Sequence, residues 1–176
     1  MDAHRHGPVP SLGYLVWRLA MRWRGELDRA LAPHGLSGAS YALLASLHAL
    51  SGRGRQPSQR ELADFTGLEP MYVSKLARTL ASAGLLERAD DPADTRALRL
   101  RITDRGVAAV EAGRAVVLSL EERRLGPLGG RLSQASLALH DTLLALLRRA
   151  EATASANEPA PGARPARAHA HRKEGR

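Results

Sequence analysis

The 176-residue sequence has no cysteine, few aromatic residues (3%) and only two lysines, Lys75 and Lys173. Because cysteine is absent, disulfides, thiolate metal sites and cysteine-based redox sensing are excluded. No segment approaches the roughly 18 consecutive apolar residues of a membrane-spanning helix. The N-terminal stretch MDAHRHGPVPS also lacks the apolar run of a signal peptide. We therefore expect a cytoplasmic protein without a membrane partner.

Signatures of catalysis and of metal binding are missing as well. No candidate nucleophile lies in an elbow motif or in a glycine-rich phosphate-binding loop. The seven histidines do not form a ligating spacing such as H-E-x-x-H. They are spread over the N-terminal arm, separate helical segments and the C-terminal tail: His4, His6, His34, His48, His140, His169 and His171. The sequence predicts neither an enzyme nor a protein with a metal or cofactor.

Apolar residues and positive charge are plentiful. Apolar residues make up 44% of the chain, mostly as leucine and alanine, which suits a helix-rich fold with an ample core. The formal net charge of +8 favours an anionic partner. Nucleic acid and an acidic membrane surface both fit this charge. Charge alone does not decide between them, because several positive residues lie in the C-terminal tail.

The most informative stretch begins at Ser58. Ser58 and Glu61 have the spacing of a capping box, which marks the start of a helix. Gly67 supplies a tight turn after it. Pro70 suits the first position of a second helix, and Gly84 suits its C-terminal end. The stretch therefore predicts two short helices joined by a glycine turn.

The second of these helices has two distinct faces. Its apolar residues recur at the helical spacing of three and four: Val73, Leu76, Ala77 and Leu80. Polar or exposed positions lie opposite or beside them: Met71, Lys75, Arg78 and Ser82, flanked by Tyr72, Ser74 and Thr79. A helix–turn–helix whose second helix shows a polar, cationic face predicts a DNA-reading element. The alternative is an ordinary solvated helix face.

A β-wing is expected to follow. Leu85 and Leu86 lead into a short strand that ends near Arg88, and ADDPADTR forms a turn-rich connection. The next segment, ALRLRI, alternates between apolar residues and arginine, which is typical of a half-buried strand. We therefore predict a mainly α fold with a small β-wing: a winged helix–turn–helix domain plus N- and C-terminal helices.

The flanking segments predict long helices and a second copy of the chain. A first helix, from Ser11 to Ala32, has more apolar surface than one small domain would cover, so we expect a homodimer. Ser37, Thr103 and Ser133 are expected to cap later helices. The predicted organisation is a flexible N-terminal arm (1–10), a dimerisation helix (11–35), the winged helix–turn–helix domain (36–103), dimerisation helices (104–150) and a disordered basic tail (151–176).

Four segments together resemble the multiple antibiotic resistance regulator (MarR) family: LSGASYALLASL, QRELADFTGLEPMYVSKLARTLASAGLLER, DPADTR and LRITDRG. The resemblance covers residues 11–150 and is most specific in 58–106. Family members are winged-helix homodimers that bind pseudo-palindromic operators, and many release DNA when a small molecule binds. The resemblance implies a sequence-specific transcriptional regulator, in most cases a repressor. One departure is that the Asp-Arg-Arg of the family's wing reads Asp94-Thr95-Arg96 here.

The helix face and the resemblance together give a set of expected DNA contacts. Lys75 can donate to guanine or phosphate, and Arg78 is placed to meet phosphate. In the family, the pair corresponding to Asp94 and Arg96 ties the wing to itself, so Arg96 has a structural alternative. The expected DNA-binding residues are Ser58, Gln59, Met71, Tyr72, Ser74, Lys75, Arg78, Arg96 and Arg99.

An effector site is also implied by the resemblance. Family pockets lie between the first helix, the second helix and the DNA-binding lobe. Carried over, this suggests a site for a small aromatic or lipophilic effector at Trp17, Arg18, Met21, Ser40, Tyr41 and Leu44. These residues could equally belong to the dimer core and the surface. Two other functions stay open: a winged-helix protein-interaction module, suggested by the acidic wing, and an effector-independent architectural DNA binder.

Overall fold

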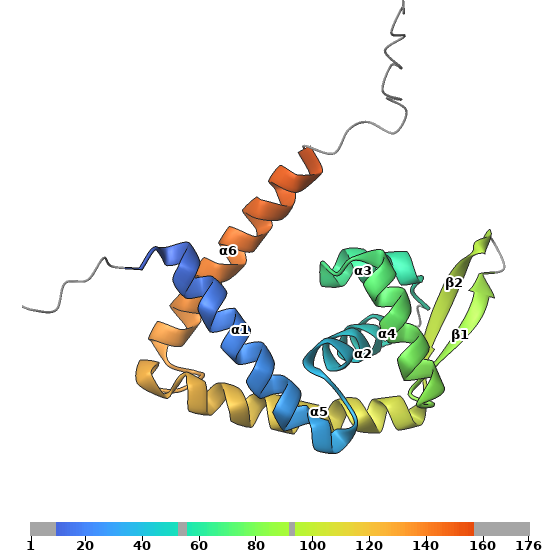
Figure 1. Cartoon of the computed structure of the whole chain (residues 1–176), viewed down its shortest axis with the longest axis horizontal. Coiled ribbons are helices and arrows are strands. Elements are labelled where there is room, and N and C mark those ends of the chain that lie inside the picture. The colour runs from blue at the N-terminus through green and yellow to red at the C-terminus, as the bar shows by residue number, and fades with distance from the viewer. Residues whose placement is uncertain (1–9, 53–55, 92–93, 157–176) are drawn as a thin grey trace, which may run out of the picture. The chain divides into compact units, whose positions relative to one another are not determined.

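The computed structural model describes residues 10–52, 56–91 and 94–156, and the side chains of 94–97 and 154–156 are outside this description (Figure 1). The chain divides into two compact units, Met1–Arg124 and Leu125–Arg176. The first unit contains the elements α1 (Leu12–Leu31), η1 (Ala32–His34), α2 (Gly38–Ser51), α3 (Gln59–Thr66), α4 (Pro70–Ser82), β1 (Leu86–Asp91), β2 (Asp94–Ile102) and α5 (Asp104–Arg124). The predicted mainly helical fold with a small wing is confirmed.

Side-chain caps start the helices where the sequence predicts them. The hydroxyl of Ser58 accepts a hydrogen bond from the Glu61 amide at 3.1 Å, and the Glu61 carboxylate accepts one from the Ser58 amide at 2.7 Å. Ser37 forms a similar reciprocal cap with Ser40. Thr103 accepts from the Gly106 amide at 3.0 Å. Each cap satisfies amide groups that the first helical turn would otherwise leave unpaired.

Two glycines set the turns around α4. Gly67 follows α3 with a φ of 65°, and Gly84 follows α4 with a φ of 69°. These left-handed conformations are costly for residues with a β-carbon, so glycine is the suitable residue at both positions. Pro70 occupies the first turn of α4, where its missing amide hydrogen costs nothing. The predicted boundaries of α4 are therefore confirmed.

The core of the first unit is built around α2. Leu43, Leu44 and Leu47 of this helix are fully buried. They belong to one cluster with the buried side of α4 and with Leu100 of β2. In Figure 1, α3, α4 and the wing lie next to α2, and α5 runs along it. The buried residues of α4 are the four that the helical spacing predicts: Val73, Leu76, Ala77 and Leu80.

The wing is longer than the sequence suggests. The first strand was expected to end near Arg88, but β1 continues to Asp91 and β2 begins at Asp94. The antiparallel register runs from Leu86 opposite Ile102 to Asp90 opposite Leu98, with an irregularity after Asp90. Aspartate has a low strand propensity, which is why the local sequence predicts a shorter strand. Main-chain pairing with β2 overrides that propensity.

Close packing explains the glycines of α5. A β-carbon at Gly113 would lie 2.7 Å from the Tyr41 ring, so glycine lets α2 approach α5.

The C-terminal end of α5 is joined to α1 by Arg124. Its guanidinium donates to the Glu26 carboxylate at 3.0 Å and lies 5.1 Å from the centre of the Trp23 ring. An arginine at this distance makes a cation–π contact.

The second unit contains η2 (Gly126–Leu128) and α6 (Gln134–Ala156). Ser133 caps α6 as predicted, because its hydroxyl accepts from the Ser136 amide at 3.2 Å. The helix continues to Ala156, past the expected start of the tail at residue 151. The arm at 1–9 and the tail at 157–176 lie outside the described residues. None of the helices in the described part of the chain combines the length and the apolar composition of a membrane span.

Candidate nucleic-acid interface

The recognition helix α4 presents its predicted polar face to solvent. Met71 is 81% exposed, and Lys75 and Arg78 are exposed as well. Ser74 is half-buried at the edge of this face. Tyr72 is half-buried and packs against the core, which reduces the surface it can offer to a ligand. The helix is therefore amphipathic in the orientation that the sequence predicts.

The two cations of this face are available for an outside partner. Neither Lys75 nor Arg78 takes part in an ion pair among the described residues. Lys75 offers an ammonium group with three donors, and Arg78 offers a planar guanidinium with five. Such groups bind phosphates and the acceptor atoms of guanine in the major groove. The face can therefore combine base contacts near Lys75 with a phosphate contact near Arg78.

Ser58 and Gln59 lie at the start of α3, and their side chains point into local structure. The Ser58 hydroxyl is used by the helix cap. The Nε2 atom of Gln59 is buried and has no hydrogen-bond partner within the described residues. A contact of either residue with DNA stays a prediction, and the burial of the Gln59 amide nitrogen makes it less accessible than expected.

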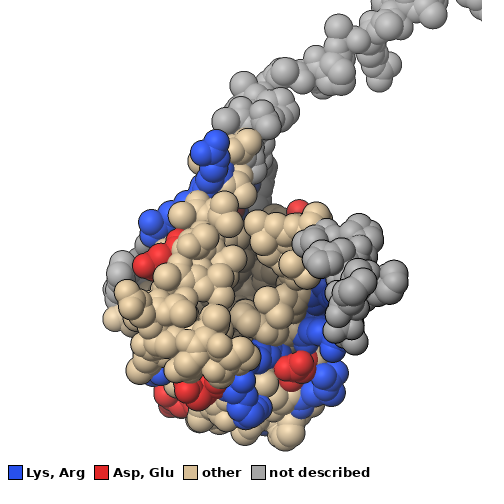
Figure 2. Space-filling view, turned by 90° about the vertical axis from the view of Figure 1, so that its left-hand side faces the viewer, with Lys and Arg blue, Asp and Glu red and all other residues tan. Residues whose placement is uncertain are grey.

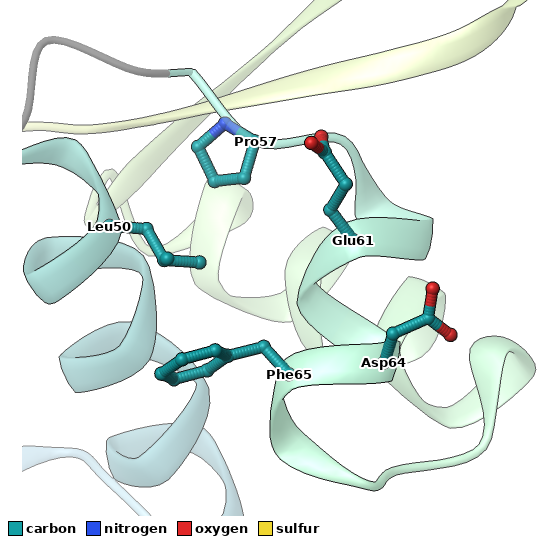
Figure 3. Close-up of a pocket in the computed structure, with 5 residues that line it drawn as sticks. All are labelled: Leu50, Pro57, Glu61, Asp64 and Phe65. Atoms are coloured by element: carbon teal, nitrogen blue, oxygen red, sulfur yellow. The ribbon is translucent and has the colours of Figure 1, made fainter.

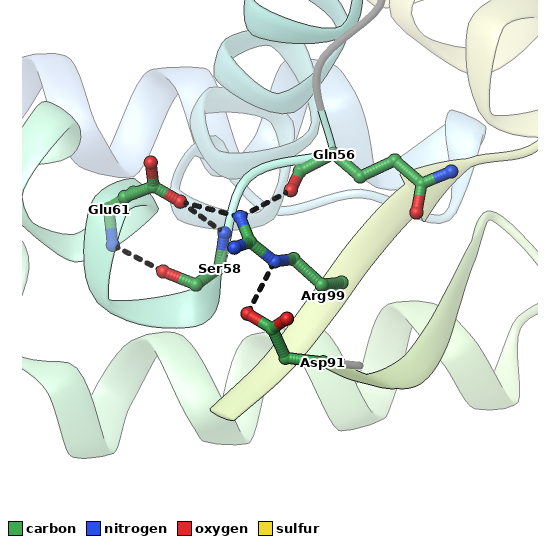
Figure 4. Close-up of polar contacts among 5 residues, drawn as sticks. All are labelled: Gln56, Ser58, Glu61, Asp91 and Arg99. Atoms are coloured by element: carbon green, nitrogen blue, oxygen red, sulfur yellow. Dashed lines mark hydrogen bonds and ion pairs between the residues drawn. The ribbon is translucent and has the colours of Figure 1, made fainter. Parts of the chain in front are cut away.

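Arg99 is engaged in a cluster of internal contacts (Figure 4). Its Nε donates to Oδ2 of Asp91 at 2.7 Å, and its Nη1 donates to Oε2 of Glu61 at 3.2 Å. Nη1 also donates to the main-chain oxygen of Gln56 at 3.0 Å. The DNA contact that we expected of Arg99 stays a prediction, but the geometry favours an internal role. No local pattern in the sequence links Arg99 to Glu61.

The wing tip is only partly described. Residues 92–93 lie outside the description, and so do the side chains of Asp94 and Arg96. The predicted ion pair between Asp94 and Arg96, and the predicted contact of Arg96 with DNA, therefore stay predictions.

The residues proposed for the effector site occupy different environments. On α1, Trp17 is 60% exposed and Met21 is 47% exposed, and Arg18 is exposed too. On α2, Leu44 is fully buried in the core, and Ser40 is buried with its hydroxyl used in the cap of α2. The structure therefore gives the six residues no common exposed surface, and the effector site stays a prediction.

Tyr41 is the member of this set with a distinct chemistry. Burial raises the pKa of its phenol, the nearby Arg114 guanidinium opposes this effect, and Glu111 and Glu121 add to it. The phenol therefore stays protonated at neutral pH and can donate a hydrogen bond.

A pocket lies elsewhere, between α2 and α3 (Figure 3). Its volume is about 300 Å³, and it contains none of the six residues expected at the effector site. Phe65, which is 59% exposed, points toward Leu50 across this pocket. The lining consists of Leu50, Pro57, Glu61, Asp64 and Phe65. Among the described residues, no group of three or more acidic or histidine side chains could hold a metal ion.

A capped helix–turn–helix, an exposed cationic face on its second helix and an antiparallel wing define a winged helix–turn–helix protein of the DNA-binding class. Residues 34–97 match the model of the MarR family. Over 116 residues, the chain is 32% identical to YdcH of Bacillus subtilis, an uncharacterized HTH-type transcriptional regulator. That alignment covers 66% of this chain and 79% of the relative. The chain belongs to the MarR family and is a transcriptional regulator rather than an enzyme.

Other similarities agree with this assignment. An HTH-type transcriptional repressor of Mycobacterium tuberculosis is 32% identical over 117 residues, which cover 66% of this chain and 81% of the relative. The transcriptional repressor CouR, solved with a 23-mer DNA duplex, superposes with a TM-score of 0.64 at 28% identity and covers 80% of this chain and 92% of its own. MepR of S. aureus, solved with DNA, has a TM-score of 0.69, and the superposition covers 81% of this chain and 99% of MepR. At 21% identity, the likeness to MepR bears on the fold alone.

Proposed function

We propose that the protein is a homodimeric repressor that binds a pseudo-palindromic operator and is released from it by a small-molecule effector. The observation that carries the DNA-binding part is the exposed face of α4, where Lys75 and Arg78 have no internal ion-pair partner among the described residues. Two copies of α4, one from each protomer, would enter successive major grooves about 34 Å apart. The similarity to CouR, a repressor solved with DNA, supports this proposal.

The strongest alternative is a winged helix that binds another protein. It is motivated by the acidic wing, in which Asp90 is exposed, and by Thr95 in place of the arginine usual in the family. Binding of a random-sequence duplex at low salt separates the two functions. A DNA-binding protein with this net charge should bind the duplex, and its affinity should fall steeply as salt is added. No detectable binding would favour the protein-interaction module.

Exposed apolar side chains support the dimer part of the proposal. On α1, Leu12 is 73% exposed and Leu15 is 47% exposed, and on α6 Leu147 is 59% exposed. Charged side chains are sparse over much of the face drawn in Figure 2. Apolar surface of this extent in one chain is typical of a protein-protein interface. We propose that α1 and α6 contribute to the contact between two copies.

A pair of substitutions in α6 tests the dimer. Leu143→Glu combined with Leu147→Glu should convert the protein to a monomer at micromolar concentration, because burying two carboxylates in an interface is costly. Sedimentation velocity measures the change. Ala145→Glu, which adds a charge on the opposite side of the same exposed helix, should leave the dimer intact. A doubly substituted protein that still sediments as a dimer would exclude this part of α6 from the interface.

Effector control has one specific alternative, an architectural DNA binder that responds to no ligand. The protonated phenol of Tyr41 could donate a hydrogen bond to the carboxylate of an aromatic acid. Thermal-shift screening with aromatic acids distinguishes the two, since a ligand that binds the folded state raises its melting temperature. Stabilisation by a compound that also weakens DNA binding would support effector control. Failure of every compound would favour the architectural binder.

A further inference from the structure

The Arg99 cluster, defined as the Arg99 side chain with Asp91, Glu61 and the Gln56 carbonyl, connects the wing to the start of α3 (Figure 4). Asp91 lies at the end of β1, and its side chain is only 6% exposed. A carboxylate buried to this extent is costly without a cationic partner. The planar guanidinium of Arg99 can face two carboxylates at once, which a lysine ammonium does less well. Arg99 is therefore committed to contacts inside the protein.

Main-chain contacts run along the same junction. The amide of Leu100 donates to the main-chain oxygen of Pro57 at 2.9 Å, and Ser58 pairs with Arg99 in an isolated antiparallel bridge. The segment 56–58 is thus held to β2 immediately before α3 begins. Because α3 packs against α4, the junction also relates the wing to the recognition helix.

We propose that Arg99 is a positioning residue for DNA binding: it holds the wing at a fixed angle to the helix–turn–helix and does not contact DNA itself. This inference rests on the proposed DNA-binding function and goes beyond it. In this proposal, α4 and the wing both contact one duplex, so their relative placement must match its shape. A wing without this anchor must be ordered when DNA binds, and the ordering cost weakens affinity for every sequence. The affinity would fall because the wing is no longer held in place, and not because a positive charge that contacts DNA has been removed.

The test compares binding of a random-sequence duplex by variants of the full chain over a range of salt concentrations. Arg99→Gln should bind about tenfold more weakly than the wild type, a shift of about 1.4 kcal/mol, because the released wing must be ordered when DNA binds. The slope of log affinity against log salt should stay unchanged, because no phosphate contact is removed. Arg99→Lys retains the positive charge next to Asp91, so it can still be measured if Arg99→Gln does not fold. Arg99→Lys should lose less affinity than Arg99→Gln, with the same slope of log affinity against log salt.

Two further variants sharpen the comparison. Asp91→Asn should weaken binding as Arg99→Gln does, and the double variant should be no weaker than either single one, because both changes break the same cluster. Arg101→Gln is the matched control. Arg101 lies on the same strand, and its ion pair with Glu87 is more than half exposed on both sides, so its loss should change affinity little. Circular dichroism establishes that each variant is folded at the temperature used.

Three outcomes would overturn the inference. Unchanged affinity of Arg99→Gln would show that the cluster is not needed for binding. If the slope of log affinity against log salt became smaller by about one per protomer, Arg99 would be identified as a direct phosphate contact. Additive losses in the double variant would show that Arg99 and Asp91 act independently. By contrast, a wild-type protein that does not bind DNA at all would contradict the proposed function itself, and this inference with it.

Discussion

A Lys75→Ala variant will lose its ability to distinguish the operator from random DNA. Lys75 is exposed on α4 and has no ion-pair partner among the described residues, so its ammonium can donate to acceptor atoms at a base edge. One good contact to a base contributes about 1–3 kcal/mol of discrimination, and a dimer makes the contact twice. The ratio of operator to random-duplex affinity should therefore fall by at least about thirtyfold. Fluorescence anisotropy with both duplexes measures this ratio.

Arg78→Ala is the matched comparison on the same face. Because Arg78 is expected to contact phosphate, its loss should weaken binding to both duplexes equally and reduce the salt slope by about one per protomer. The two variants therefore separate base reading from charge. If Lys75→Ala discriminated between the duplexes as well as the wild type, the assignment of the reading face would be wrong.

A Gly106→Ala variant will be strongly destabilised. A β-carbon at Gly106 would lie 2.0 Å from the main-chain oxygen of Leu85 and 2.8 Å from Cγ1 of Ile102. The Leu85 oxygen cannot easily retreat, because it accepts a hydrogen bond from the Thr103 amide at 3.2 Å. Overpacking of this kind costs about 1–3 kcal/mol and occasionally more. We expect a loss of about 3 kcal/mol in the free energy of unfolding, measured by urea denaturation at a fixed protein concentration.

Gly25→Ala provides the control for this experiment. Gly25 lies inside α1, and a β-carbon there would meet only Nη1 of Arg29 at an ordinary distance of 3.5 Å. Alanine has the higher helix propensity, so this variant should be more stable by about 0.5–1 kcal/mol. Equal stability of Gly106→Ala and the wild type would mean that the start of α5 does not approach Leu85 as closely as the structure shows.

The recognition helix could be predicted from sequence because its signals are local. Pro70 starts it, Gly84 follows it, and the apolar spacing from Val73 to Leu80 identifies its buried side. The capping box at Ser58 is local in the same sense. Each signal is a short-range effect on backbone conformation or helix termination, so no knowledge of the tertiary fold was needed.

The features that were missed depend on tertiary contacts. The length of β1 is set by pairing with β2, which overrides the poor strand propensity of Asp90 and Asp91. The link from Arg99 to Glu61 joins residues far apart in sequence, and the alternation of β2 showed only that Arg99 lies on its polar side. The effector residues came from the family resemblance alone, and the structure places Trp17 and Leu44 in opposite environments.

Footprinting of the wild-type protein on the DNA that flanks its own gene tests the central claim most directly. If two copies of α4 read an operator, the protein should protect a pseudo-palindromic site whose half-sites are about 34 Å apart, or one turn of DNA. Protection should appear at concentrations well below those that coat random DNA, and Lys75→Ala should abolish it there. Uniform coating without a preferred site, or no protection at all, would contradict the account of this protein as an operator-reading regulator.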